Sequence, residues 1–151
     1  MNTAQAQLGP VLAAGGQELA DLLEGTEDRL AEVTKGHVDG LGHHAGGTLA
    51  AGGKRLRPML VFLCATRPDE RLVAAGAAVE LLHMATLVHD DVLDGAELRR
   101  GRPTVFADGG RGAATATGDL LFSRAFAQLA ATRSDDAVRA LSEASSALAR
   151  G

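Results

Sequence analysis

Two acidic residues one helical turn apart, Asp90 and Asp94, are the strongest candidates for chemistry in this sequence. They belong to the run ELLHMATLVHDDVLD, which spans residues 80–94. On a helix that turns about 100° per residue, both acids share a sector of about 60° with His83, and Asp91 lies just beside that sector. Oxygen ligands with room left for water and phosphate suit Mg²⁺ better than zinc. The run therefore predicts a magnesium site at Asp90 and Asp94, with Asp91 as a further candidate ligand.

The alternative interpretation is that these acids form an ordinary helix end exposed to solvent, which is the usual situation of a run of charges. Here the acids follow Leu81, Leu82 and Val88, so the helix that carries them is apolar enough to be largely buried. Carboxylates on a buried helix need a counterion or a cleft. We therefore favour the metal site over the solvated end.

A second cluster, GGKRLRP at residues 52–58, places three cations in four positions at the start of a helix. Its glycines allow close backbone approach, and Lys54, Arg57 and a helix N-terminus together suit a diphosphate group. A short basic run is also common on any protein surface. The Gly-x4-Gly-Lys-Ser/Thr spacing of a P-loop and the strand that precedes one are both missing.

A third cluster, ELRRGRPT at residues 97–104, directly follows the acidic helix. Arg99 and Arg100 are close enough to Asp94 to bind phosphates that the metal also binds. The alternative is that these arginines pair with Asp94 and Glu97 in surface ion pairs, which contribute little.

Glycines and prolines divide the chain into helix-length pieces, and alternating β-branched residues are absent. We expect an all-α antiparallel helix bundle of about five or six helices in one domain, residues 1–151. A helix over 36–53 would be marginal, because each interior glycine costs about 1 kcal/mol relative to alanine. A turn is expected at residues 67–69 and a loop over Gly95–Gly112. The expected helices are Leu8–Val33, Pro58–Ala65, Glu70–Asp94, Ala113–Ala131 and a last one with Ser134 as its N-cap.

Composition excludes several classes of protein. The 151 residues are 46% apolar and 23% charged, with a net charge of -4, whereas a nucleic-acid-binding protein needs a surplus of Lys and Arg. No signal-like N-terminus and no stretch of about 18 uninterrupted apolar residues is present, so we expect a cytoplasmic protein that is not transmembrane. Cys64 stands in an apolar run and is expected to be a small buried side chain.

Four motifs in one order, GGKRLRP, ELLHMATLVHDDVLD, RRGRPT and GDLLFSRAF, resemble the trans-isoprenyl (polyprenyl) diphosphate synthase family over residues 52–126. The resemblance implies an isoprenoid-synthase-type fold and a Mg²⁺-dependent head-to-tail condensation in isoprenoid biosynthesis. In that reaction an allylic prenyl diphosphate ionises and isopentenyl diphosphate attacks the carbocation.

The resemblance also implies a role for each matching residue. Mg²⁺ on the allylic diphosphate would be held by Asp90 and Asp94, with Arg99 on the same substrate; these three are the expected catalytic residues, because cations stabilise a departing diphosphate. Ala85 stands where a bulky aromatic blocks the elongation tunnel in short-chain members, so a longer product is expected. The side chains expected to bind isopentenyl diphosphate are Lys54, Arg57, His83 and Arg100.

The sequence departs from the family pattern in two respects. Phe106 and Gly109 replace the asparagine and the large apolar residue usual at these positions, which predicts a looser loop before helix 113–131. The second aspartate-rich motif, which the family carries in its C-terminal half, is not present in residues 1–151. We therefore expect an N-terminal half that is inactive alone and works in a homodimer, or in a heterodimer with a chain carrying the second motif.

Two other functions are compatible with parts of the sequence. The chain could be a non-catalytic regulatory or substrate-binding subunit of a full-length prenyl synthase. It could also be an HD-type metal phosphohydrolase built on His89-Asp90, with further ligands from His37, His43 and His44, although the two basic motifs would then have no role.

Overall fold

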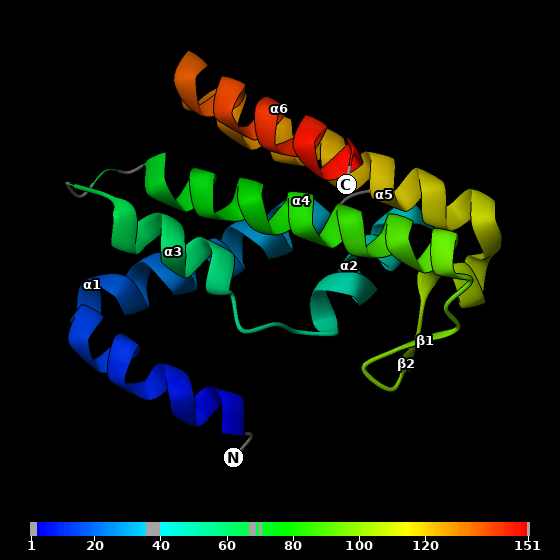
Figure 1. Ribbon diagram of the computed structural model, residues 1–151, viewed down its shortest axis with the longest axis horizontal. Coiled ribbons are helices and arrows are strands. Elements are labelled where there is room, and N and C mark those ends of the chain that lie inside the picture. Colours follow the sequence, from blue (N-terminus) through cyan, green and yellow to red (C-terminus); the bar gives the residue numbers. More distant parts are fainter. Residues whose placement is uncertain (1–2, 36–39, 67–68, 70, 151) are drawn as a thin grey trace.

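Helix α4, Arg71–Asp94, is the central element of the fold and carries the acidic run at its carboxyl end (Figure 1). Its buried side chains include Leu81, Ala85 and Val88, which belong to one continuous apolar core. The helix packs against α1 (Thr3–Thr34), α3 (Leu56–Cys64), α5 (Val105–Ala131) and, less extensively, α6 (Asp135–Arg150). Burial on several sides explains why this segment is apolar around most of its circumference.

The computed structural model describes residues 3–35, 40–66, 69 and 71–150. Helices α1 and α5 are each interrupted at a glycine with positive φ, Gly16 (62°) and Gly110 (74°). Besides α4 and the four helices that pack against it, the described residues form α2 (Leu41–Ala50). The expectation of an all-α fold with about six helices is thus confirmed.

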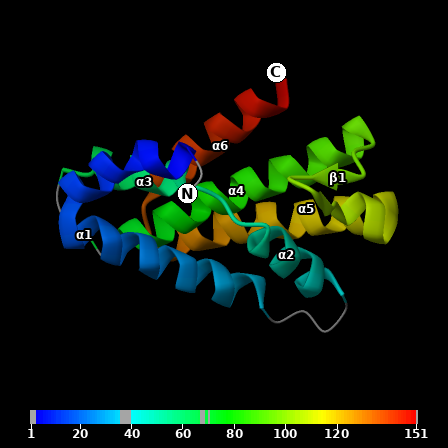
Figure 2. The ribbon, with the colours of Figure 1, turned by 90° about the horizontal axis from the view of Figure 1, so that it is seen from below.

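Helices α4 and α5 lie side by side and run in opposite directions, whereas α6 leaves the end of α5 at an angle and diverges from it (Figure 2). Helices α1 and α3 also pack against α4, and α2 contacts both α1 and α5. The expected N-cap of the last helix is present, because Ser134 Oγ accepts a hydrogen bond from the Ala137 amide at 3.3 Å. By length and composition alone α4 could span a membrane, but half of its most apolar window is buried inside this bundle.

A small hairpin joins α4 to α5, where the sequence predicted only a loop. Strands β1 (Leu98–Arg99) and β2 (Arg102–Pro103) pair antiparallel, with Arg99 opposite Arg102. The two turn residues, Arg100 and Gly101, both have positive φ, 53° and 77°, as a tight two-residue hairpin turn of the primed type requires. The hairpin fixes the direction in which each arginine leaves the backbone.

Three other expectations need correction. Residues 41–50 do form a helix, because α2 packs against α1 and α5 and this tertiary contact outweighs the cost of its glycines. The loop expected over Gly95–Gly112 is shorter, because Thr104 caps α5 by accepting from the Ala107 amide at 3.0 Å.

Cys64 is exposed, because α3 turns Met59 and Phe62 toward the core and Cys64 away from it. Of the turn expected at 67–69, residues 67 and 68 lie outside the described residues.

Candidate functional site

A cleft of about 1170 Å³ lies where α2, the 51–57 loop, α3, α4 and the hairpin meet. The sequence prediction named five cationic or potentially cationic side chains as substrate-binding residues, and the fold brings all of them to this cleft. They are Lys54, Arg57, His83, Arg99 and Arg100. Their roles as substrate-binding residues stay predictions.

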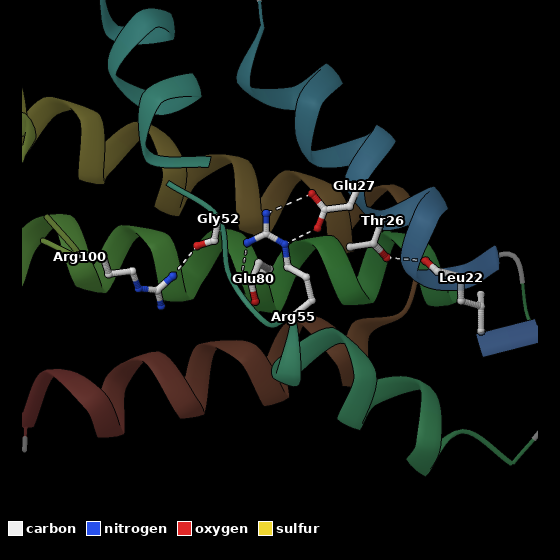
Figure 3. Close-up of polar contacts among 7 residues, drawn as sticks. All are labelled: Leu22, Thr26, Glu27, Gly52, Arg55, Glu80 and Arg100. Carbon is white, nitrogen blue, oxygen red and sulfur yellow. Dashed lines mark hydrogen bonds and ion pairs between the residues drawn. The ribbon is translucent and has the colours of Figure 1, made fainter. Parts of the chain in front are cut away.

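The three cations of residues 54–57 differ in their partners. Arg55, which had no predicted role, bridges two acids: its Nη1 donates to Glu80 Oε1 at 2.9 Å, and its Nη2 donates to Glu27 Oε2 at 3.1 Å. Its Nε is bonded to the other oxygen of Glu27. Figure 3 shows the guanidinium held between Glu27 on α1 and Glu80 on α4. Burial is the largest single effect on the pKa of Arg55 and lowers it, but the hydrogen bonds and charges of Glu27 and Glu80 together outweigh burial, so the pKa is raised.

Lys54 and Arg57 are exposed and, within the described part of the chain, have no hydrogen bond or ion pair. His83 is half-buried beside them, and its pKa is lowered from the ordinary 6.5, first by burial and then by the positive charge of Arg57. Arg100 and Arg99 contribute in the same direction. An imidazole whose pKa is lowered beside Arg57, Arg99 and Arg100 lies in a positive environment that favours an anion.

The hairpin contributes its arginines from the opposite side of the cleft. Arg100 donates from Nη1 to the Gly52 carbonyl at 2.5 Å, as Figure 3 shows. Arg102, also without a predicted role, donates to the Ala50 carbonyl at 3.1 Å, where a cation suits the C-terminal end of α2. These two bonds connect the hairpin to the end of α2 and to the 51–57 loop. Both sets of cations therefore face one cleft.

The three acids of the predicted metal site differ in exposure. Asp90 and Asp94 are exposed, whereas Asp91 is buried. Asp91 accepts from Arg99 Nε at 2.9 Å. Asp90 and Asp94 add weaker electrostatic attraction to Arg99, so all three acids lie within range of this arginine.

The residues present fit a magnesium ion shared with a phosphate ligand. Asp90 and Asp94 offer oxygen donors on one face of α4, at the helix end where the macrodipole is negative and a cation is favoured. Among the residues that the structure describes, no three His, Cys, Asp or Glu side chains gather as a metal site. Two exposed carboxylates suit an ion that takes its remaining ligands from water and substrate. Metal binding by Asp90, Asp91 and Asp94 stays a prediction.

Two other predicted residues lie away from the cleft. Ala85 is fully buried in the core and does not belong to the residues that line the cleft. His89, the first residue of the His-Asp doublet, points toward α5 instead, where its Nε2 lies 3.3 Å from Asp119 Oδ1. His37 lies outside the described residues. The described histidines and acids do not assemble the ligand set that an HD-type phosphohydrolase needs.

The sequence held one usable signal for the partners of Arg55. Glu80 precedes Leu81 and Leu82 in a long apolar segment, and an acid in such a position needs a cation. Glu27 carries no such signal, because it stands in the polar stretch EGTEDR.

Comparison with known proteins gives concordant results. The polyprenyl synthetase family model matches residues 41–151. Heptaprenyl diphosphate synthase component 2 of Geobacillus stearothermophilus is 44% identical over 74% of this chain and 36% of that protein. Nonaprenyl diphosphate synthase of Mycobacterium tuberculosis is 42% identical over 67% of this chain and 31% of that protein.

A solved structure has the same arrangement of helices. The polyprenyl synthase of Caulobacter crescentus, complexed with calcium and isoprenyl diphosphate, superposes with a TM-score of 0.78 at 34% identity, over 91% of this chain and 42% of that one. The chain thus spans about a third of the length of the curated relatives it matches, at 36% and 31%.

Proposed function

Because the chain belongs to the polyprenyl synthetase family, we propose that residues 1–151 supply the isopentenyl diphosphate site and one carboxylate-bearing wall of a trans-polyprenyl diphosphate synthase. The observation that carries the proposal is the convergence of Lys54, Arg57, His83, Arg99 and Arg100 on one cleft beside the acidic end of α4. The activity is head-to-tail condensation of isopentenyl diphosphate with an allylic prenyl diphosphate.

The two diphosphates would occupy different parts of this site. Lys54 and Arg57 have no protein partner in the described structure, so they are free to bind the diphosphate of isopentenyl diphosphate together with His83 and Arg100. Asp90 and Asp94 would hold Mg²⁺ on the allylic diphosphate, and this ion would supply positive charge to the leaving group. Arg99 acts electrostatically on His83 and is itself affected by Asp90 and Asp94, so its guanidinium is near enough to stabilise the negative charge that would grow on the allylic diphosphate as its C–O bond breaks.

The apolar part of the cleft would receive the growing hydrocarbon chain. Met84, Leu87 and Val88 line it on α4, on the helix turns before the acids. The names of the heptaprenyl and nonaprenyl synthases among the relatives support a long product. We therefore propose a polyprenyl diphosphate longer than farnesyl diphosphate as the product.

The charge of two diphosphates calls for carboxylates and metal ions on both sides of the cleft, and the candidate metal-binding acids among the described residues, Asp90, Asp91 and Asp94, all lie on α4. We propose that the second set comes from residues outside these 151, on the same polypeptide or on a partner chain. A heptaprenyl synthase designated component 2 among the relatives supports a two-chain assembly. A homodimer or a heterodimer would both fit this proposal.

The test is reconstitution. The 151-residue chain is assayed for condensation of labelled isopentenyl diphosphate with an allylic primer, alone and after co-expression with the C-terminal part of a related synthase. We expect activity only in the mixture, dependent on Mg²⁺ and removed by Asp90→Ala. Asp28→Ala, which removes an exposed acid of α1, is the matched control and should leave activity unchanged.

Two outcomes would redirect the proposal. Turnover by the 151-residue chain alone would mean that no outside carboxylates are required. If the chain instead changes the rate or product of an intact synthase, and Asp90→Ala does so equally well, the chain is a regulatory subunit rather than part of the catalytic site.

A further inference from the structure

The three cations of the Lys54–Arg57 run have different environments although they are nearly adjacent in sequence. The Arg55 side chain is 12% exposed and lies between Glu27 and Glu80, whose side chains are 47% and 6% exposed. Lys54 and Arg57 are exposed and have no ion pair among the described residues. The run therefore contains one paired cation between two unpaired ones.

We propose that Arg55 is a positioning residue that neutralises Glu27 and Glu80 and thereby keeps Lys54 and Arg57 available to an incoming diphosphate. The inference rests on the proposed function only in taking a diphosphate as the ligand. Arg55 itself does not need to touch that ligand.

The need for neutralisation follows from the burial of Glu80. A carboxylate that is 6% exposed cannot stay ionised without a cation or hydrogen-bond donors. Glu80 and Arg57 both act electrostatically on His83, in opposite directions, and both line the cleft together with Lys54. Without Arg55, Glu80 would attract other cations of the cleft, among them Arg57 and Lys54, which are the ones that the diphosphate needs.

The local backbone is shaped to bring Arg55 to both acids. Arg55 adopts the left-handed conformation, with φ of 49°, which is strained for a residue with a side chain. A Cβ atom at Gly53 would lie 2.9 Å from Arg55 Nη1 and 3.5 Å from Glu80 Oε1. Arg55 reaches the two acids through three different nitrogens of its planar guanidinium, a geometry that the single ammonium nitrogen of lysine does not reproduce, so lysine is not equivalent here.

Calorimetric binding of inorganic diphosphate, without metal so that Asp90 and Asp94 do not contribute, tests the inference. Arg55→Met should weaken binding at least about tenfold, because both flanking cations become engaged by Glu80 and Glu27. Arg55→Lys should lie between this variant and wild type. Arg139→Met, which removes an exposed arginine of α6, is the matched control and should bind as wild type does.

A second substitution distinguishes neutralisation from simple structural support. The double variant Arg55→Met/Glu80→Gln removes the buried charge along with its partner, so its affinity should recover to within about threefold of wild type. Glu80→Gln alone should bind diphosphate at least as tightly as wild type. Wild-type affinity in Arg55→Met overturns the inference, and so does a double variant that melts near the wild-type temperature yet binds as weakly as Arg55→Met.

A readout without ligand separates this inference from the proposed function. If wild type fails to bind diphosphate, or binds it equally well after Lys54→Ala and Arg57→Ala, the proposed site is wrong. The NMR titration of His83 then decides the role of Arg55. We expect the pKa of His83 to rise in Arg55→Met, because Glu80 loses its partner, and to fall again in Arg55→Met/Glu80→Gln. An unchanged His83 pKa in Arg55→Met would contradict the inference.

Discussion

Arg99 donates from Nε to Asp91 Oδ1 at 2.9 Å, and its Nη2 lies 2.8 Å from the same oxygen in an ion pair. The middle acid of the HDDVLD run therefore holds the first arginine of the hairpin in place. The Asp91 side chain is 7% exposed and that of Arg99 36%. The pair links the buried face of α4 to the cleft and separates the role of Asp91 from that of its two exposed neighbours.

Asp91→Ala should lower the free energy of unfolding by about 2 kcal/mol. Removing one member of a buried ion pair costs about 3–5 kcal/mol, and the partial exposure of Arg99 reduces that figure. Urea denaturation measures the change. Arg99→Ala should lower the free energy of unfolding by less, because it leaves an acid that can be protonated. A fully retained stability in Asp91→Ala would mean that the pair is not formed in solution.

Asp90→Asn and Asp94→Asn should have the opposite effect on stability. Both acids are exposed near the negative end of the α4 macrodipole and repel each other at i and i+4, so neutralising either should raise stability in metal-free buffer by a few tenths of a kcal/mol. The same changes should reduce the Mg²⁺-dependent affinity for a non-hydrolysable allylic diphosphate analogue at least about tenfold. Thermal melts with and without Mg²⁺, together with calorimetry, measure the two effects.

Asp28→Ala is the control for that experiment, since it removes an exposed acid of α1 and should alter neither quantity. Analogue binding by Asp90→Asn and Asp94→Asn that equals wild type would show the metal assignment to be wrong.

The helices were largely predictable because their signals are local. The Ser134 cap and the apolar spacing of the segments around 71–94 and 113–131 each depend on residues within a few turns. The hairpin was not predictable by the same means, because strands of two residues are too short to show alternation. The hydrogen-bonding capacity of Thr104, which both caps α5 and donates to the Ala96 carbonyl at 2.6 Å, was the overlooked local signal.

The pairing of charged side chains within the site depends on contacts between residues that are distant in sequence. Glu80 and Glu27 lie 25 and 28 positions from Arg55, so nothing local distinguishes Arg55 from Lys54 or Arg57. In the same way, helical spacing placed Asp91 beside Asp90 and Asp94, but only the hairpin geometry pairs it with Arg99. The sequence could therefore predict which residues gather but not which of them neutralise one another.

Diphosphate binding should be accompanied by proton uptake at His83. In the free protein the pKa of His83 lies below 6.5, first because of burial and then because of Arg57. A bound diphosphate opposes that positive charge and raises the pKa, so affinity should increase as the pH falls toward and below 6.5. Calorimetry in two buffers of different ionisation enthalpy measures the uptake, and His83→Gln should remove the part that exceeds titration of the ligand itself.

The same lowered pKa affects stability in the free protein, with the opposite dependence on pH. Because the folded pKa lies below the unfolded one, the unfolded state takes up its proton first as the pH falls through about 6.5. Stability should therefore decrease in that window, and less steeply in His83→Gln. Equal slopes for the two proteins would contradict the assigned shift.

Ala85→Phe should shorten the product of the reconstituted enzyme, if the tunnel passes this position. Ala85 is fully buried, so the added ring should also overpack the core and cost about 1–3 kcal/mol. Product chromatography at a temperature where the variant remains folded by circular dichroism separates the two effects. An unaltered chain length in a folded Ala85→Phe enzyme would remove the tunnel role from this position.

Gly76→Ala should destabilise the protein, whereas Gly46→Ala should stabilise it. Alanine is favoured over glycine within a helix by about 1 kcal/mol, and a Cβ at Gly46 in α2 meets nothing within 4 Å. At Gly76 in α4 the Cβ would lie 2.6 Å from Phe62 Cζ and 3.2 Å from Thr26 Oγ1. Phe62 is buried in α3 and Thr26 in α1, so neither can move freely, and the clash should outweigh the helix preference by about 1–3 kcal/mol. Paired denaturation curves decide it: stabilisation by both changes would mean that α1, α3 and α4 do not meet as closely at Gly76 as the fold requires.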